Sequence, residues 1–155
     1  MSPRSSNSLD SVTAFLIPNV SREATFFFPF DLDTRMTGLA IVCLDRGIHA
    51  QFERFKAKRE LTLRYSVLLR SDFADAHGAQ SAICLTKGDM LGSRTTLTVV
   101  SDEYLPMRRL EVLLNQDIHE QSVHLYGLSF PDPLNPGKIE ACIEIPRIPS
   151  EWESV

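Results

Sequence analysis

Residues 60–70 read ELTLRYSVLLR and alternate apolar with polar side chains almost throughout. The apolar side chains that fall on one side of an extended chain are Leu61, Leu63, Tyr65, Val67 and Leu69. Only Leu68 interrupts the polar side. Successive side chains of a strand point to opposite faces of its sheet, so this stretch predicts a β-strand with one face in the core.

Further strands are predicted along the rest of the chain. Residues 139–145 alternate in the same way, and Pro146 ends them because proline has no amide hydrogen to donate. Less regular candidates, rich in β-branched and aromatic residues, are Ala24–Phe30, Gly38–Leu44, Gln80–Thr86, Thr95–Val100, Arg109–Leu114 and Ser122–Phe130. Turn-forming residues separate them. The expected fold is all-β, a single antiparallel β-sandwich or jelly-roll-like domain of about seven or eight strands with one or two short helices.

One segment departs from this strand pattern. Ile48, Phe52 and Phe55 recur at helical spacing, which predicts a short amphipathic helix over Ile48–Lys58 with both phenylalanines facing the core. A second helical turn is possible from Tyr104, because Pro106 suits only the first positions of a helix.

The chain of 155 residues fits one domain. We expect a flexible arm over residues 1–12, a β-sandwich over residues 13–146 and an extended tail over residues 147–155. The Ser-rich start does not read as a signal peptide, and no apolar run approaches the roughly 20 residues that cross a bilayer.

Three cysteines, Cys43, Cys84 and Cys142, lie far apart and have no CxxC spacing. They are expected to be buried free thiols rather than zinc ligands or a disulfide framework. A reducing compartment follows, and the predicted location is the cytoplasm, or a virion if the protein is viral.

No sequence motif for catalysis is present, and the four histidines have no useful spacing. The prediction is a protein that is not an enzyme and holds neither metal nor cofactor. Two alternatives stay open. Asp31 and Asp33 can share one side of an extended segment and either bind a hard cation such as calcium or face a basic partner. Scattered residues such as Asp72, Asp75 and His77 can build a site only in three dimensions.

Charge is unevenly distributed although the net charge is only −4. Residues 46–70 carry seven basic and two acidic residues, a local charge of +5, whereas residues from Ser101 onward have a charge of −6. The basic segment predicts a surface for RNA or for an acidic protein through Arg54, Lys56, Lys58 and Arg59. Alternatively, opposite faces of two copies attract each other and give a homo-oligomer.

The order of elements in residues 48–89 resembles part of a viral fold. A helix with the sequence IHAQFERF precedes basic residues, an alternating strand and a further strand that ends at Lys87-Gly88-Asp89. This resembles the helix-then-strand segment of viral jelly-roll capsid proteins, and plant viral movement proteins are resembled about as well. The resemblance departs from RNA-packaging capsids in one respect, because residues 1–20 contain a single basic residue, Arg4.

The resulting functional hypothesis is a non-enzymatic structural protein, of viral coat, matrix or movement type, that self-associates. Trp152 in the tail is the predicted interface anchor, because large aromatic residues dominate interface energies. The rival hypothesis is a β-scaffold binding module that holds single-stranded nucleic acid or a protein partner through the basic segment.

Overall fold

The computed structural model describes residues 26–30, 33–70, 78–80, 83–133 and 140–153. These residues form one mixed sheet of seven strands and few helices. The strands are β1 (Met36–Gly38), β2 (Thr62–Leu69), β3 (Gly78–Gln80), β4 (Ile83–Leu91), β5 (Arg94–Ser101), β6 (Val123–Pro131) and β7 (Glu140–Glu144). The helices are α2 (Arg46–Ala57), α3 (Met107–Leu114) and α4 (Ser150–Glu153).

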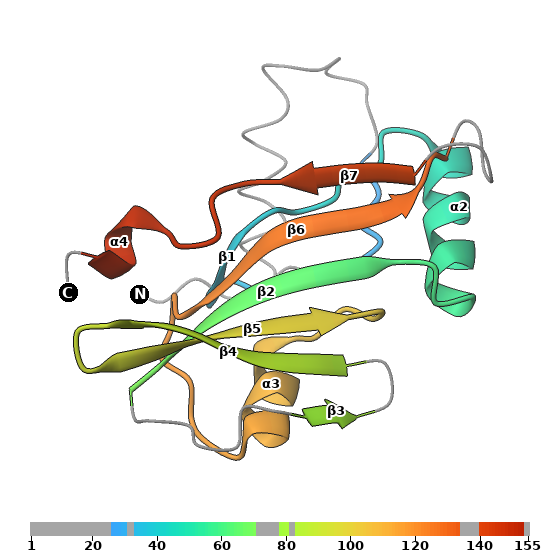
Figure 1. Ribbon diagram of the computed structural model, residues 1–155. Coiled ribbons are helices and arrows are strands. Elements are labelled where there is room, and N and C mark those ends of the chain that lie inside the picture. Colours follow the sequence, from blue (N-terminus) through green and yellow to red (C-terminus); the bar gives the residue numbers. More distant parts are fainter. Residues whose placement is uncertain (1–25, 31–32, 71–77, 81–82, 134–139, 154–155) are drawn as a thin grey trace.

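The strands are ordered β1-β6-β2-β5-β4-β3, and β7 also pairs with β6 (Figure 1). β1 runs parallel to the first half of β6, at Val123–Leu125, and β7 runs antiparallel to its second half, at Gly127–Pro131. The antiparallel sandwich predicted from the sequence is therefore not confirmed. The part of the chain that is described forms a single sheet with one parallel pair.

The strand predicted from residues 60–70 lies near the centre of the sheet as β2. Leu63, Tyr65 and Val67 are fully buried, as the alternation predicted. The opposite side of β2 is also covered, because Ser66 and Leu68 are 1% and 4% exposed. Burial on both faces explains why Leu68 interrupts the polar series.

Helix α2 confirms the predicted amphipathic helix and stands at the end of the sheet where β6 ends and β2 begins (Figure 1). Asp45 caps it by accepting hydrogen bonds from the amides of Gly47 and Ile48. Phe52 and Phe55 are buried, and Phe52 lies 5.0 Å from the ring of Phe130 on β6.

Helix α3 corrects the strand predicted at Arg109–Leu114. Its buried residues, Met107, Leu110 and Leu114, follow helical spacing, whereas Val112 is 75% exposed. Leu110, Val112 and Leu114 also fit a period of two, so the short apolar run was ambiguous. Pro106 immediately precedes the first helical residue, as the alternative reading from Tyr104 allowed.

The long strands predicted at Ala24–Phe30 and Gly38–Leu44 are also wrong within the described residues. Only the short strand β1 and one bridge, between Phe27 and Cys43, form there. Gly38 ends β1 with a φ of +106°, a backbone conformation that suits glycine. A Cβ atom at this position would lie 2.2 Å from the carbonyl oxygen of Leu125, so β1 and β6 approach closely only because residue 38 is glycine.

No helix within the described ranges has the length and apolar character needed to cross a membrane.

Candidate functional site: a carboxylate pocket at Asp33

A cavity of about 120 Å³ lies where the chain enters and leaves β1. Asp33 is the acidic residue among those that line it. The other lining residues are mostly apolar and come from three regions, the β1 segment, the β5–α3 loop and β6: Phe30, Met36, Thr37, Gly38, Leu39, Ala40, Ile41, Tyr104, Leu125 and Leu128. Mostly apolar cavities that carry a few polar groups are where proteins most often bind small ligands.

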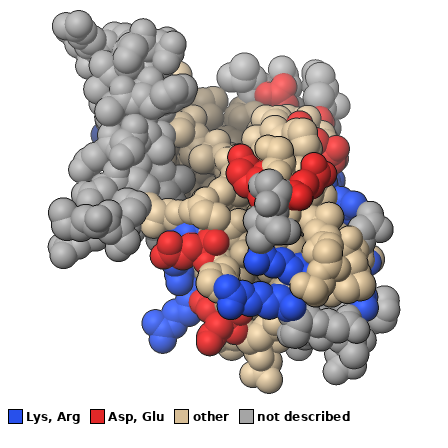
Figure 2. Space-filling model, turned by 90° about the vertical axis from the view of Figure 1, so that its left-hand side faces the viewer, with Lys and Arg blue, Asp and Glu red and all other residues tan. Residues whose placement is uncertain are grey.

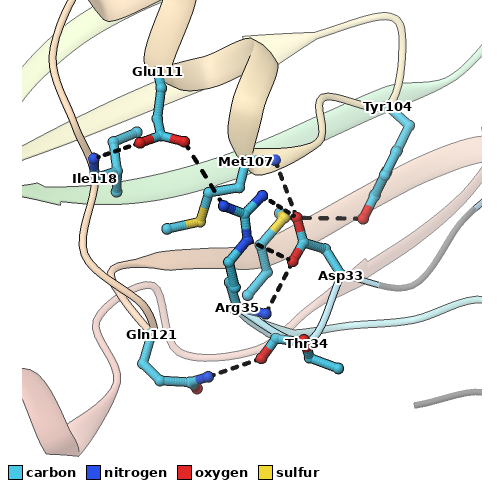
Figure 3. Close-up of polar contacts among 9 residues, drawn as sticks. Asp33, Thr34, Arg35, Tyr104, Met107, Glu111, Ile118 and Gln121 are labelled. Atoms are coloured by element: carbon cyan, nitrogen blue, oxygen red, sulfur yellow. Dashed lines mark hydrogen bonds and ion pairs between the residues drawn. The ribbon is translucent and has the colours of Figure 1, made fainter. Parts of the chain in front are cut away.

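The Asp33 carboxylate is held by donors on two sides (Figure 3). It accepts hydrogen bonds from the backbone amide of Arg35 at 2.9 Å and from the guanidinium Nε and Nη2 atoms of Arg35 at 3.3 Å. The backbone amide of Met107, at the start of α3, donates from the other side at 3.3 Å. The Asp33 side chain is only 15% exposed, so these contacts fix the carboxylate at the wall of the cavity.

Burial by itself raises the pKa of the Asp33 carboxyl. The hydrogen bonds and positive charge of Arg35, together with the Met107 amide, outweigh burial and hold this pKa below its ordinary value of 3.8. Asp33 is therefore ionised at neutral pH despite its position in the pocket.

Arg35 joins the Asp33 turn to α3. Its Nη1 atom lies 3.8 Å from the carboxylate of Glu111, which in turn accepts a hydrogen bond from the amide of Ile118 at 3.1 Å. The hydrogen bond to Asp33 is the largest influence on the pKa of Arg35 and raises it. The cation stays charged and links the two carboxylates.

Two aromatic rings form one wall of the cavity. Phe30 and Tyr104 stack with 5.2 Å between ring centroids and an interplanar angle of 19°. The same two residues line a second, more open groove of about 570 Å³ next to α2. The cavity and the groove therefore meet at a flat aromatic surface.

The residues predicted to bind RNA or an acidic partner lie at the end of α2 and just beyond it. The Nζ atom of Lys56 donates to the carbonyl oxygen of Pro29 at 2.5 Å and lies 5.4 Å from the centroid of Phe30, so it reaches the groove. Arg59 pairs with Asp102 at 3.2 Å. Arg54 and Lys58 are exposed. The structure therefore brings Lys56 alone of the four to the edge of the candidate site.

The predicted interface anchor, Trp152, packs on its own chain. It is 6% exposed, and its indole Nε1 donates to the carbonyl oxygen of Gln121 at 2.9 Å. The cation-binding alternative rested on Asp31 and Asp33. Asp31 lies outside the described residues, as do Asp72, Asp75 and His77 of the scattered-site alternative. Asp33 itself contacts amide and guanidinium donors.

The sequence pattern presents Asp33 as a cation ligand or as a carboxylate that faces a basic partner, and it does not indicate Arg35 or Tyr104 as site residues. The local sequence contains a weak signal for the contact between Asp33 and Arg35, since an acidic and a basic residue two positions apart can bond each other. No local pattern points to Tyr104, because it lines the same cavity as Asp33 only through the arrangement of β1 beside β6 and α3.

The fold class defined by this mixed sheet is shared with solved structures of RNA pseudouridylate synthase domain proteins. Human RNA pseudouridylate synthase domain containing 4 is similar with a TM-score of 0.67 and 9% identity, over 94% of this chain and 80% of that chain. Human RNA pseudouridylate synthase domain containing 1 is similar with a TM-score of 0.61 and 16% identity, over 90% and 76% respectively. No family model and no curated protein sequence matches the chain. At these identities the likeness shows the fold.

The resemblance to viral jelly-roll capsid and movement proteins is wrong, because the fold is that of these RNA pseudouridylate synthase domain structures. The same finding overturns the predicted non-enzymatic structural role. Acidic and basic segments also pair within one molecule: Arg59 pairs with Asp102, and Arg64 lies 3.8 Å from Glu144. The predicted homo-oligomer has no support in the fold comparison.

Proposed function

We propose that this protein is an RNA-modifying enzyme that isomerises a uridine of RNA to pseudouridine at the Asp33 pocket. The supporting observation is the coincidence of two features. The fold matches RNA pseudouridylate synthase domain structures over 94% of the chain. The cavity in this fold carries an ionised carboxylate beside a stacked aromatic pair.

The chemistry suits a pocket that carries a carboxylate. In the isomerisation the N1–C1′ bond of uridine breaks and a C5–C1′ bond forms. The hydrogen on C5 leaves to solvent as a proton and N1 gains a proton, so no oxidant, reductant or cofactor is consumed. C1′ becomes electron-poor as its bond to N1 breaks, and a fixed carboxylate stabilises such a centre. Asp33 is the proposed catalytic residue.

The aromatic wall and the end of α2 provide the proposed RNA contacts. Phe30 and Tyr104 offer a flat surface on which a base can stack. Arg54 and Lys58 are exposed cations suited to phosphates. The face shown in Figure 2 carries Lys and Arg side chains beside Asp and Glu side chains, so neither charge dominates it. RNA contact through a local cluster of cations fits a chain with a net charge of −4.

The test uses a pool of random-sequence RNA transcripts with tritium at C5 of uridine. The wild-type protein is expected to release tritium to water, and Asp33→Asn is expected to lower the rate by about 100-fold or more, as when an electrostatic stabiliser of the transition state is removed. Asp117→Asn, at an exposed position, is the matched control and should release tritium at the wild-type rate. Equal release by Asp33→Asn and wild type would show that the pocket is not the site.

A further inference from the structure

Gln121 joins three parts of the chain around the Asp33 turn. Its backbone amide donates to the carbonyl oxygen of Arg35 at 2.8 Å, and its side-chain amide donates to the carbonyl oxygen of Thr34 at 3.0 Å (Figure 3). Its own carbonyl oxygen accepts the hydrogen bond from Nε1 of Trp152. One residue therefore ties both residues that follow Asp33 to the C-terminal segment.

The backbone of Gln121 is held in an unfavourable conformation. Its φ is +63°, in the left-handed region that residues with a side chain rarely adopt. Such a conformation persists where the surrounding contacts determine it. Here two of the contacts, the hydrogen bonds to Arg35 and Trp152, depend on the direction of the Gln121 peptide groups. The third, to Thr34, is made by the Gln121 side chain.

The C-terminal segment is anchored to the same region by a second set of contacts. His124 on β6 lies with its Nε2 atom 3.1 Å from the carbonyl oxygen of Pro146 and its Nδ1 atom 2.8 Å from the hydroxyl of Thr37 on β1. A carbonyl oxygen can only accept, so Nε2 carries the hydrogen of the bond to Pro146. The ring of Trp152 lies edge-on to His124, with 6.3 Å between centroids.

We propose that Gln121 and Trp152 are positioning residues, through which the C-terminal segment holds the Asp33 turn against α3. Neither residue lines the cavity, and they act through the backbone of Thr34 and Arg35. The part they play in catalysis rests on the proposed function of Asp33. Their effect on the Asp33 carboxylate is independent of RNA.

The test measures the Asp33 carboxylate directly by NMR. Trp152→Phe keeps an aromatic ring but removes the indole donor, and Gln121→Met removes the side-chain amide without adding charge. Each is expected to raise the pKa of Asp33 towards its ordinary value, because the turn no longer holds Arg35 and Met107 in place as donors. Exchange of the Arg35 and Met107 amide hydrogens, which both bond Asp33, should be faster by about fivefold, the effect of one weakened hydrogen bond.

Gln51→Met on α2 makes the same substitution away from the turn and should change neither quantity. An unchanged Asp33 pKa and unchanged exchange in Trp152→Phe and Gln121→Met would overturn the proposal. Should one variant fail to fold, the other decides alone. A wild-type protein without tritium release, combined with the expected NMR changes, would contradict the RNA function and leave the positioning role standing. Tritium release by the wild type without the NMR changes in the variants would support the RNA function and overturn the positioning role.

Discussion

At the scale of single residues, the site depends on how one turn places opposite charges. Asp33 and Arg35 bond each other and the start of α3, so the carboxylate stays ionised while it is largely shielded from solvent. The arrangement costs little at neutral pH because the buried charge has donors on each side. The ion pair stabilises the folded protein only while Asp33 is ionised. As the pH falls below 3.8, Asp33 becomes protonated, and the free energy of unfolding should decrease.

His124 should make the free energy of unfolding depend on pH in a separate range, nearer neutrality. Burial lowers its pKa below the ordinary value of 6.5, although the hydrogen bond to Pro146 and the charge of Glu151 oppose the shift. The unfolded chain therefore binds a proton more readily than the folded chain, and the free energy of unfolding should fall as the pH drops through 6.5.

Urea unfolding of the wild type and His124→Gln between pH 8 and pH 5 checks this, because glutamine offers the same donor and acceptor without titrating. The wild type should lose more stability than the variant over this range. His119→Gln, at an exposed position, is the control and should follow the wild type. Parallel curves for wild type and His124→Gln would contradict the prediction.

At the scale of elements, the parallel pairing of β1 with β6 places the Asp33 turn beside α3. Gly38→Ala tests this pairing, because the new Cβ would meet the Leu125 carbonyl oxygen at 2.2 Å. Gly92→Ala is the matched control, since Gly92 also has a positive φ but has nothing within 4 Å of a new Cβ.

Gly92→Ala should cost about 1–2 kcal/mol of unfolding free energy for the backbone conformation alone. Gly38→Ala should cost more than this and should also lower tritium release from RNA, since β1 must move away from β6. Chemical denaturation of both variants measures the difference. Equal losses of stability would show that the approach of β1 to β6 is not what requires glycine.

The exposed cations at the end of α2 lead to a separate prediction about the salt dependence of RNA binding. Arg54 and Lys58 are exposed there, and neutralising two phosphate contacts should reduce the slope of log affinity against log salt by about 0.7 for each contact with single-stranded RNA. The double variant Arg54→Ala, Lys58→Ala should therefore bind a random-sequence transcript more weakly and with a shallower salt dependence in filter binding.

Arg94→Ala, in the β4–β5 hairpin away from α2, is the control for this comparison (Figure 1). It should keep the wild-type slope. A double variant with the wild-type salt dependence would place the RNA contacts elsewhere on the protein.

Some elements of the fold were predictable from the sequence pattern, and others were not. The alternation at residues 60–70 predicted β2 correctly because half of its side chains enter the core, and the spacing of Phe52 and Phe55 predicted α2. The strand prediction for residues 109–114 was wrong because a short apolar run fits both the strand period and the helix period. Only the burial of individual side chains distinguishes the two. The Asp33 site was missed for another reason. Asp33 and Tyr104 line one cavity and Gln121 bonds the residue after Asp33, although the three are distant in sequence. The parallel β1–β6 pair and α3 bring them into one region.

At the scale of the whole molecule, the fold changes what the charge pattern means. Basic and acidic segments that suggested contacts between copies instead pair within the chain, at Arg59–Asp102 and Arg64–Glu144. The fold shared with RNA pseudouridylate synthase domain structures directs attention to the pocket where the aromatic pair meets Asp33. The proposed function therefore depends on the Asp33 pocket and on pseudouridine as the product.

The most direct measurement identifies that product. RNA transcripts are incubated with the protein and digested to nucleosides, which are then separated by chromatography with mass detection. Pseudouridine should appear with the wild-type protein and with Asp117→Asn, and should be absent or reduced by about 100-fold or more with Asp33→Asn. RNA that is bound by the wild-type protein but contains only unchanged uridine, or equal pseudouridine from Asp33→Asn, would contradict the account.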